Sequence, residues 1–164
     1  MKFRIQKLEQ FTGEQAGIYS IFLEDEQQTM FERFLKENVS LFKSEIIDIT
    51  QRIKAINEKT GAREQYFKFK EGIPGDGICA LYDLPEKHLR LYCIRYGSSL
   101  LILGGGGLKE KEIRAFQENE KLTEENYFLR KVSDLITERI KDGEIEYTAD
   151  YTQLTGNLDF NTDE

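Results

Sequence analysis

Basic side chains in the middle of the chain have the types and spacing to bind a phosphodiester. They lie in, or at the ends of, apolar segments that we expect to be neighbouring strands, and they are Arg63, Lys68, Lys70, Arg90, Arg95 and Lys109. Guanidinium and ammonium groups bind phosphate oxygens through charge-assisted hydrogen bonds. Tyrosines that could stack on nucleobases are interleaved with them, at Tyr66, Tyr82, Tyr92 and Tyr96. The alternative interpretation is a solvated sheet face with extended basic side chains.

Consecutive glycines end the last of these apolar segments, in the stretch LLILGGGGLK at 100–109. A Walker loop requires G-x-x-x-x-G-K-[ST], but Lys109 is followed by Glu110. A dinucleotide fingerprint requires another glycine spacing and a parallel sheet, whereas the flanking segments indicate an antiparallel meander. We therefore expect the glycines to mark a β-bulge or the close approach of another backbone. A bound RNA backbone at Gly105 and Gly106 would be one such case.

The cysteines and the histidine do not form a metal or nucleophile motif. Cys79 and Cys93 lie in two apolar segments, and His88 is the only histidine of the chain. These residues are a poor set of metal ligands, so we expect two small buried cysteines and expect neither a metal nor a cofactor. His88 falls in a predicted turn, and the sequence indicates no Ser/His/Asp triad.

Hydrophobic periodicity predicts the elements that must position the basic residues. Strands are predicted where apolar residues alternate or form short runs, over 3–7, 66–70, 78–84, 89–97 and 98–105. Helices are predicted where apolar residues recur every three or four positions, over 25–38, 40–61, 110–122 and 123–143. The short connection between the first two helices predicts an antiparallel hairpin. The acidic, Thr-rich end is predicted to hold one strand at 144–148 and then to be mobile.

The sequence therefore predicts an α+β fold. An N-terminal helix hairpin would pack on a small antiparallel sheet of three or four strands, followed by additional C-terminal helices. No apolar run approaches the ~20 residues that span a bilayer, and the N-terminus has no secretory apolar region. We expect a cytoplasmic protein with no membrane partner.

Charge is distributed unevenly along the 164 residues, whose net charge is −7. Residues 63–111 carry 8 Lys/Arg and 6 Asp/Glu, whereas residues 112–164 carry 6 and 14. The overall acidity argues against promiscuous binding of nucleic acid but leaves room for a local basic site. One hypothesis is that the acidic last third partly shields the basic sheet in cis.

The central segments GICALYDL, HLRLYCIRYG and SLLILGGGGLK follow the sequence pattern of a known family. Together with the basic YFKFK before them, they resemble the RelE/ParE/HigB superfamily of type II toxin–antitoxin toxins. The resemblance covers 63–113 in sequence and about 1–122 in the order of the elements. It implies a RelE-like toxin domain over 1–122, with an acidic helical extension and tail over 123–164.

The resemblance also implies a function, that of a ribosome-dependent mRNA endoribonuclease neutralised by a cognate antitoxin of helix-turn-helix type. Carried over by position, the implied catalytic residues are Arg90, Lys109, Lys68 and Lys70. The candidate substrate-binding residues are Arg63, Arg95, Tyr92, Gly105 and Gly106. The alternative is a non-catalytic protein of the same fold that binds an antitoxin or a DNA-binding regulator. A third alternative is an enzyme that holds a nucleotide at the glycines.

Overall fold

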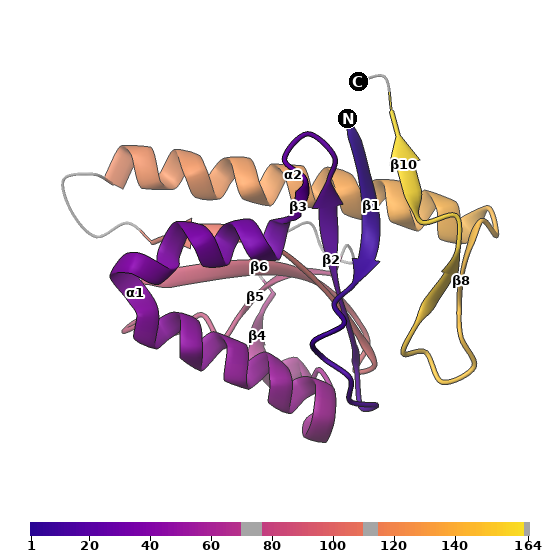
Figure 1. Cartoon of the computed structure of the whole chain (residues 1–164), viewed down its shortest axis with the longest axis horizontal. Coiled ribbons are helices and arrows are strands. Elements are labelled where there is room, and N and C mark those ends of the chain that lie inside the picture. The colour runs from indigo at the N-terminus through magenta and orange to yellow at the C-terminus, as the bar shows by residue number, and fades with distance from the viewer. Residues whose placement is uncertain (70–76, 110–114, 163–164) are drawn as a thin grey trace.

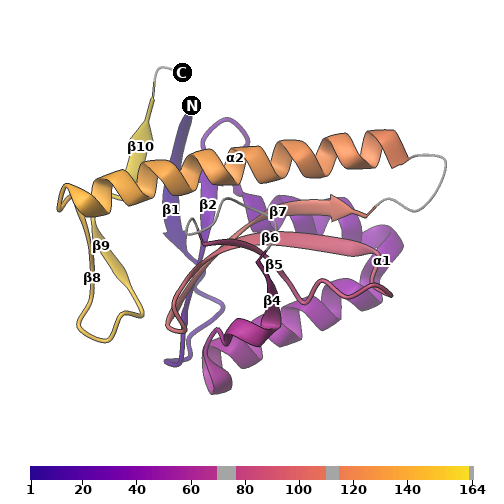
Figure 2. The same ribbon diagram turned by 180° about the vertical axis from the view of Figure 1, so that it is seen from behind.

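The computed structural model describes residues 1–69, 77–109 and 115–162, which form three layers. A mixed sheet lies in the middle, with α1 (Met30–Ala55) on one face and α2 (Ala115–Lys141) on the other, as Figures 1 and 2 show. The sheet has eight strands in the order β10-β1-β2-β7-β6-β5-β4, and β3 pairs beside β2. The strands are β1 (Lys2–Lys7), β2 (Gly17–Leu23), β3 (Gln28–Thr29), β4 (Phe67–Lys68), β5 (Ile78–Leu81), β6 (Leu89–Tyr96), β7 (Leu100–Leu108) and β10 (Asp159–Asn161).

The short elements complete the chain. A π-helical turn, η1 (Ile56–Thr60), continues α1, and a 3₁₀ turn, η2 (Glu64–Tyr66), precedes β4. Strands β8 (Ile145–Tyr147) and β9 (Leu154–Gly156) form a separate antiparallel pair after α2.

The sheet has one parallel pairing, between β2 and β7, in which Gly17 to Ser20 lie opposite Leu100 to Leu103. All its other pairings are antiparallel. Alternate residues of β7 face opposite cores, because successive strand residues point to opposite faces. Leu100 and Ile102 lie in the core under α2, and Leu101 and Leu103 in the core under α1. The sheet is therefore buried on both faces.

The predicted helix hairpin and small antiparallel sheet are wrong. The N-terminal helical region is one element with a sharp kink, at which the backbone of Phe42 has φ −131° and ψ 42°. Figure 1 shows the ribbon of α1 changing direction part-way along its length. Asn38, predicted to end a first helix, instead donates from Nδ2 to the carbonyl of Phe34 at 2.8 Å and stays inside α1. The helix begins at a capping box, in which Thr29 and Glu32 bind each other's backbone amides.

The predicted pair of C-terminal helices is wrong too. One helix, α2, runs without a break through residues 122 and 123. Residues 110–114 of the first predicted helix lie outside the described residues. The acidic end, expected to be mobile, instead supplies β9 and β10. Strand β10 pairs with β1, where Phe160 stacks on Phe3 with ring centroids 4.6 Å apart, so the two ends of the chain lie side by side (Figure 1).

The predicted first strand and the antiparallel meander are confirmed as β1 and as β5, β6 and β7. The strand predicted at 144–148 is confirmed as β8. The cysteines are buried and directly opposite each other in β5 and β6, with Sγ atoms 3.5 Å apart, as free thiols.

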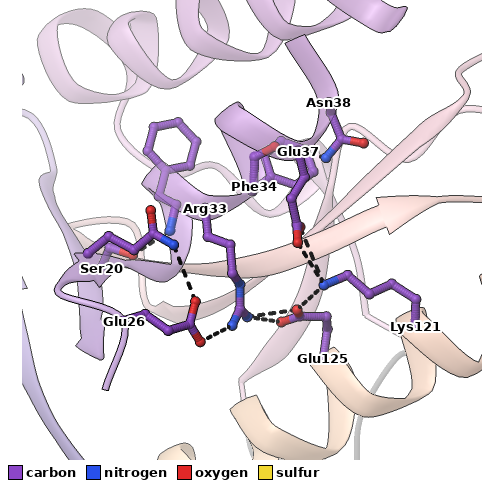
Figure 3. A network of polar contacts seen from close by, with 10 residues as sticks. Ser20, Glu26, Arg33, Phe34, Glu37, Asn38, Lys121 and Glu125 are labelled. Carbon is purple, nitrogen blue, oxygen red and sulfur yellow. Dashed lines mark hydrogen bonds and ion pairs between the residues drawn. The ribbon is translucent and has the colours of Figure 1, made fainter. Parts of the chain in front are cut away.

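An ion-pair network joins α1 to α2 near the point where β2 and β7 cease to pair (Figure 3). There the hydroxyl of Ser20 donates to the carbonyl of Leu103 at 2.7 Å. The Arg33 guanidinium donates to both oxygens of Glu125, at 2.7 and 2.9 Å, and Lys121 Nζ lies 2.9 Å from the same carboxylate. Glu125 is 5% exposed, so its charge is buried and requires these partners.

Candidate functional site

Three of the four predicted catalytic cations meet at one buried carboxylate, that of Asp83. Arg90 Nε donates to Oδ2 at 2.9 Å, and Lys109 Nζ donates to Oδ1 at 2.9 Å. Lys68 Nζ lies 3.6 Å from Oδ2. The Asp83 side chain is 2% exposed. Residues from β4, from β6 and from just after β7 are thus brought together, as the predicted adjacency of their strands requires. Lys70 lies outside the described residues.

Asp83 is ionised in the folded protein. Burial raises the pKa of its carboxyl, but Lys109, Arg90 and Lys68 outweigh that effect and hold the pKa below its usual range. Lys109 also donates to the carbonyl of Leu84 at 2.6 Å, and its side chain is only 10% exposed. The Asp83 cluster, defined as Asp83 with Lys68, Arg90 and Lys109, therefore anchors the turn that follows β5. Whether its cations also act on a substrate stays a prediction.

The predicted substrate-binding residues do not gather around this cluster. Arg95 donates from Nε to the carbonyl of Ala62 at 2.7 Å, and Arg63 is exposed just before η2. Tyr92 is 3% exposed and belongs to the core under α2. These side chains sit in different surroundings, and their predicted binding role stays untested.

The glycines form a β-bulge, as expected, and the close approach there is that of α2. The register of β6 and β7 shifts between Leu91 and Cys93, so that Gly104 and Gly105 together oppose Tyr92. A Cβ atom on Gly105 would overlap the Glu125 carboxylate of α2. A Cβ atom on Gly106 would overlap the backbone carbonyl of Arg90 in β6. The absence of side chains on Gly105 and Gly106 thus lets this protein's own elements pack closely.

A second polar group consists of His88, to which the sequence assigned no role, and Glu45, which the sequence did not single out. His88 Nδ1 lies 2.6 Å from Glu45 Oε2, and the ring stacks on Phe42 at the kink of α1, with centroids 5.1 Å apart. The backbone amides of His88 and Leu89 also donate to the Glu45 carboxylate, at 2.9 and 3.1 Å. The Glu45 carboxylate therefore holds both the His88 ring and the backbone of residues 88 and 89.

These bonds hold the Glu45 carboxyl in its ionised form. Burial raises the pKa of the Glu45 carboxyl. The bonds from the His88 ring and from the amides of Leu89 and His88 lower the pKa by more than burial raises it, so the pKa lies below its usual range. An ionised carboxylate only accepts hydrogen bonds, so Nδ1 of His88 carries the proton. The other ring nitrogen, Nε2, is then the proton acceptor in the neutral imidazole. The His88 side chain is 57% exposed, and Glu45 only 15%.

The same face of α1 carries a second carboxylate, Asp48, one turn after Glu45. Its Oδ2 accepts from Arg52 Nε at 3.0 Å and lies 3.4 Å from Lys87 Nζ. Arg52 in turn lies over the ring of Tyr82, 4.2 Å from its centroid. Tyr82 stacks on Tyr66, with centroids 5.1 Å apart.

We call this region the His88 surface, and its residues are Phe42, Glu45, Asp48, Arg52, Tyr66, Tyr82, Lys87 and His88. It lies on the α1 side of the sheet. The Asp83 cluster lies on the α2 side of the sheet. Arg90 pairs with Gly107, and paired residues face the same side of a sheet; a Cβ atom on Gly107 would contact Lys121 of α2, so Arg90 faces α2 as well. The two are joined by the 82–88 turn and by the bond from the Lys109 amide to the His88 carbonyl, at 2.8 Å.

One signal in the sequence could have revealed the His88 surface. Glu45, Asp48 and Arg52 are spaced by three and four positions in the helix predicted over 40–61, which places them on one face. That face can pair with the basic residues of the 82–88 turn only if the turn packs against the helix, and nothing in the sequence indicates this contact.

Within residues 1–69, 77–109 and 115–162, no cluster of three or more His, Cys, Asp or Glu side chains could hold a metal ion. Over the same ranges, neither helix is long and apolar enough to cross a membrane. No protein-family model, curated protein or solved structure matches the chain.

Proposed function

We propose that the protein is an endoribonuclease in which His88 transfers protons at the scissile phosphodiester. The observation that carries the proposal is the bond between Glu45 and His88. A carboxylate held by three donors orients an exposed imidazole and fixes its tautomer. This is the arrangement required of a general base whose second nitrogen faces the substrate.

The reaction proposed is attack by a ribose 2′-hydroxyl on its own 3′-phosphate. His88 Nε2 takes the proton from the 2′-oxygen, the bond from that oxygen to phosphorus forms, and the bond from phosphorus to the 5′-oxygen breaks. The departing oxygen takes a proton from water, and the hydroxide so formed takes back the proton that His88 received. The products are a 2′,3′-cyclic phosphate and a 5′-hydroxyl, and no co-reactant is consumed.

Arg52 and Lys87 are the cations in this proposal that bind the phosphate. Both are paired with Asp48, and their side chains are 37% and 29% exposed. Lys87 precedes His88 in the chain, and Asp48 ties Arg52 to Lys87, so in this proposal both cations offset the negative charge that grows in the transition state. The Asp83 cluster, on the other side of the turn, holds that turn in place.

The role as a toxin, with mRNA on the ribosome as substrate and a helix-turn-helix antitoxin as partner, rests on the resemblance to the RelE/ParE/HigB superfamily over 63–113. A cytoplasmic location belongs to the same proposal. The resemblance placed catalysis on Arg90, Lys109, Lys68 and Lys70, whereas the geometry favours His88 as the proton-transfer group.

Induced expression in bacteria tests the proposal. We expect wild-type protein to arrest growth and fragment cellular mRNA, His88→Ala to do neither, and Lys54→Ala, a change of an exposed residue of α1 outside the His88 surface, to behave as wild type. Growth without arrest in the wild type, or equal RNA fragmentation by His88→Ala, contradicts the assignment.

A non-catalytic binding protein is the second candidate, because exposed apolar side chains lie just before the kink of α1. Leu41 is 78% exposed and Val39 42%. Burying these two side chains against a partner would remove their apolar surface from water. In this case His88→Ala would leave the cellular phenotype intact, and Leu41→Lys would remove it.

A further inference from the structure

Arg52, Tyr82 and Tyr66 lie one over another on the His88 surface, and we call these three residues the stack. The guanidinium carbon of Arg52 lies 4.2 Å from the centroid of Tyr82, and the rings of Tyr82 and Tyr66 lie 5.1 Å apart with 23° between their planes. We propose that this stack is a nucleobase-binding platform that makes the protein select single-stranded RNA. The proposal rests on the proposed function, because it names the substrate class of the same site.

The stack is held rigidly by the backbone. Tyr82 has φ +46°, in the left-handed region that bulky side chains rarely adopt. Its amide donates to the carbonyl of Tyr66 at 2.8 Å, which ties together the backbones of the two stacked residues. Strain of this kind is retained where the surroundings over-determine the conformation, and it is common at binding sites. The aromatic rings are therefore aligned before any ligand binds.

The composition of the stack suits RNA. Aromatic faces and Arg guanidinium planes are the groups on which unpaired bases stack, whereas bases inside a duplex have no free faces. Tyr66 and Tyr82 are half-buried, and the Arg52 side chain is 37% exposed. A base added to this stack would extend it, and its phosphate would meet the positive charge of Arg52.

The position of the stack links it to the proposed proton transfer. Asp48 bonds both Arg52 and Lys87, and Lys87 is the residue immediately before His88. A nucleotide stacked on the platform therefore has its neighbouring phosphodiester directed along Lys87 towards His88. Base pairing would prevent this placement, so we expect the enzyme to act on unpaired segments.

Binding of a short single-stranded RNA that carries one 2-aminopurine tests the platform. The measurements use His88→Ala protein, so that the RNA stays intact. We expect quenching of the 2-aminopurine fluorescence on binding, because the base stacks. Adding Tyr66→Ala should weaken binding at least about fivefold and relieve the quenching, since stacking contributes about 1–3 kcal/mol per base. Adding Tyr66→Phe, which keeps the ring, should change affinity less than twofold.

A second variant tests the platform in case Tyr66→Ala protein does not fold. Arg52→Lys keeps the charge but loses the planar group, and we expect it to relieve part of the quenching with little change in the melting temperature. Equal affinity for a duplex of the same sequence, or undiminished quenching in Tyr66→Ala and Arg52→Lys, overturns the platform. Cleavage by the wild type is scored separately: loss of quenching in Tyr66→Ala with no cleavage by wild type refutes the nuclease but not the platform.

Discussion

Glu45 Oε2 lies 2.6 Å from His88 Nδ1, although 43 residues separate the two in sequence. The contact brings the helix just past the kink of α1 against the turn between β5 and β6. Phe42, at the kink itself, supplies the ring on which His88 stacks.

Replacing Glu45 with Gln should reduce RNA cleavage at least about tenfold, since oriented general bases contribute about 10²–10⁴ to the rate. A neutral amide has one acceptor oxygen and so cannot receive all three donors from residues 88 and 89. The measurement is the single-turnover rate at saturating enzyme. Glu37→Gln, on the same helix but outside the His88 surface, is the control. A Glu45→Gln enzyme with the wild-type rate would show that the carboxylate does not orient the base.

Replacing Asp83 with Ala should destabilise the protein by about 3 kcal/mol, because the buried ends of Arg90 and Lys109 lose their counter-charge. Urea unfolding followed by circular dichroism measures this loss. Asp25→Ala, an exposed carboxylate, should change the free energy of unfolding by less than about 0.5 kcal/mol. A similar small change for Asp83→Ala would mean that the cluster does not anchor the turn.

Stability should fall at acidic pH because of the same carboxyl. The folded-state pKa of Asp83 lies below its ordinary value of 3.8, so the unfolded chain binds the proton more readily. Its contribution is complete above that value and is lost as the pH falls through the lower pKa of the folded state. Unfolding free energies measured between pH 6 and pH 2 check this. Asp83→Asn should flatten the acid limb of the curve, and an unchanged slope would contradict the assignment.

Replacing Gly105 with Ala should destabilise the packing of α2 by about 1–3 kcal/mol, as overpacking does. The added methyl overlaps the Glu125 carboxylate, which Arg33 and Lys121 hold in place (Figure 3). Gly107→Ala is the matched control, because its Cβ lies 3.3 Å from a flexible part of Lys121. Equal melting temperatures for the two variants would exclude the packing explanation of the glycines.

Local patterns in the sequence are sufficient to predict the antiparallel meander and the β-bulge at the glycines. Alternation in 78–105 and the turn at Gly97 define β5, β6 and β7, and adjacency of these strands explains why Arg90 and Lys109 meet. The parallel pairing of β2 with β7 was not predictable, because both strands are buried on both faces and carry no register signal.

The candidate site was predicted only in part, for a physical reason. A sequence shows the basic residues directly. The buried carboxylate with which they pair, that of Asp83, belongs to one acidic residue among many and is not distinguished by the sequence. His88 appeared isolated because its partner, Glu45, comes from an element that tertiary packing alone brings near it. The sequence also does not predict the kink at Phe42. It predicts that the helix ends at Asn38, whereas the Asn38 side chain bonds to the carbonyl of Phe34 and the helix continues.

The most direct test of the central claim is the chemistry of the RNA ends. Purified protein is incubated with a single-stranded RNA, free and on ribosomes, and the new termini are mapped. We predict 2′,3′-cyclic phosphate and 5′-hydroxyl ends from the wild type, and intact RNA with folded His88→Ala. Intact RNA with the wild type under both conditions, or the same ends at the same rate from His88→Ala, would contradict the assignment of His88 as the proton-transfer residue.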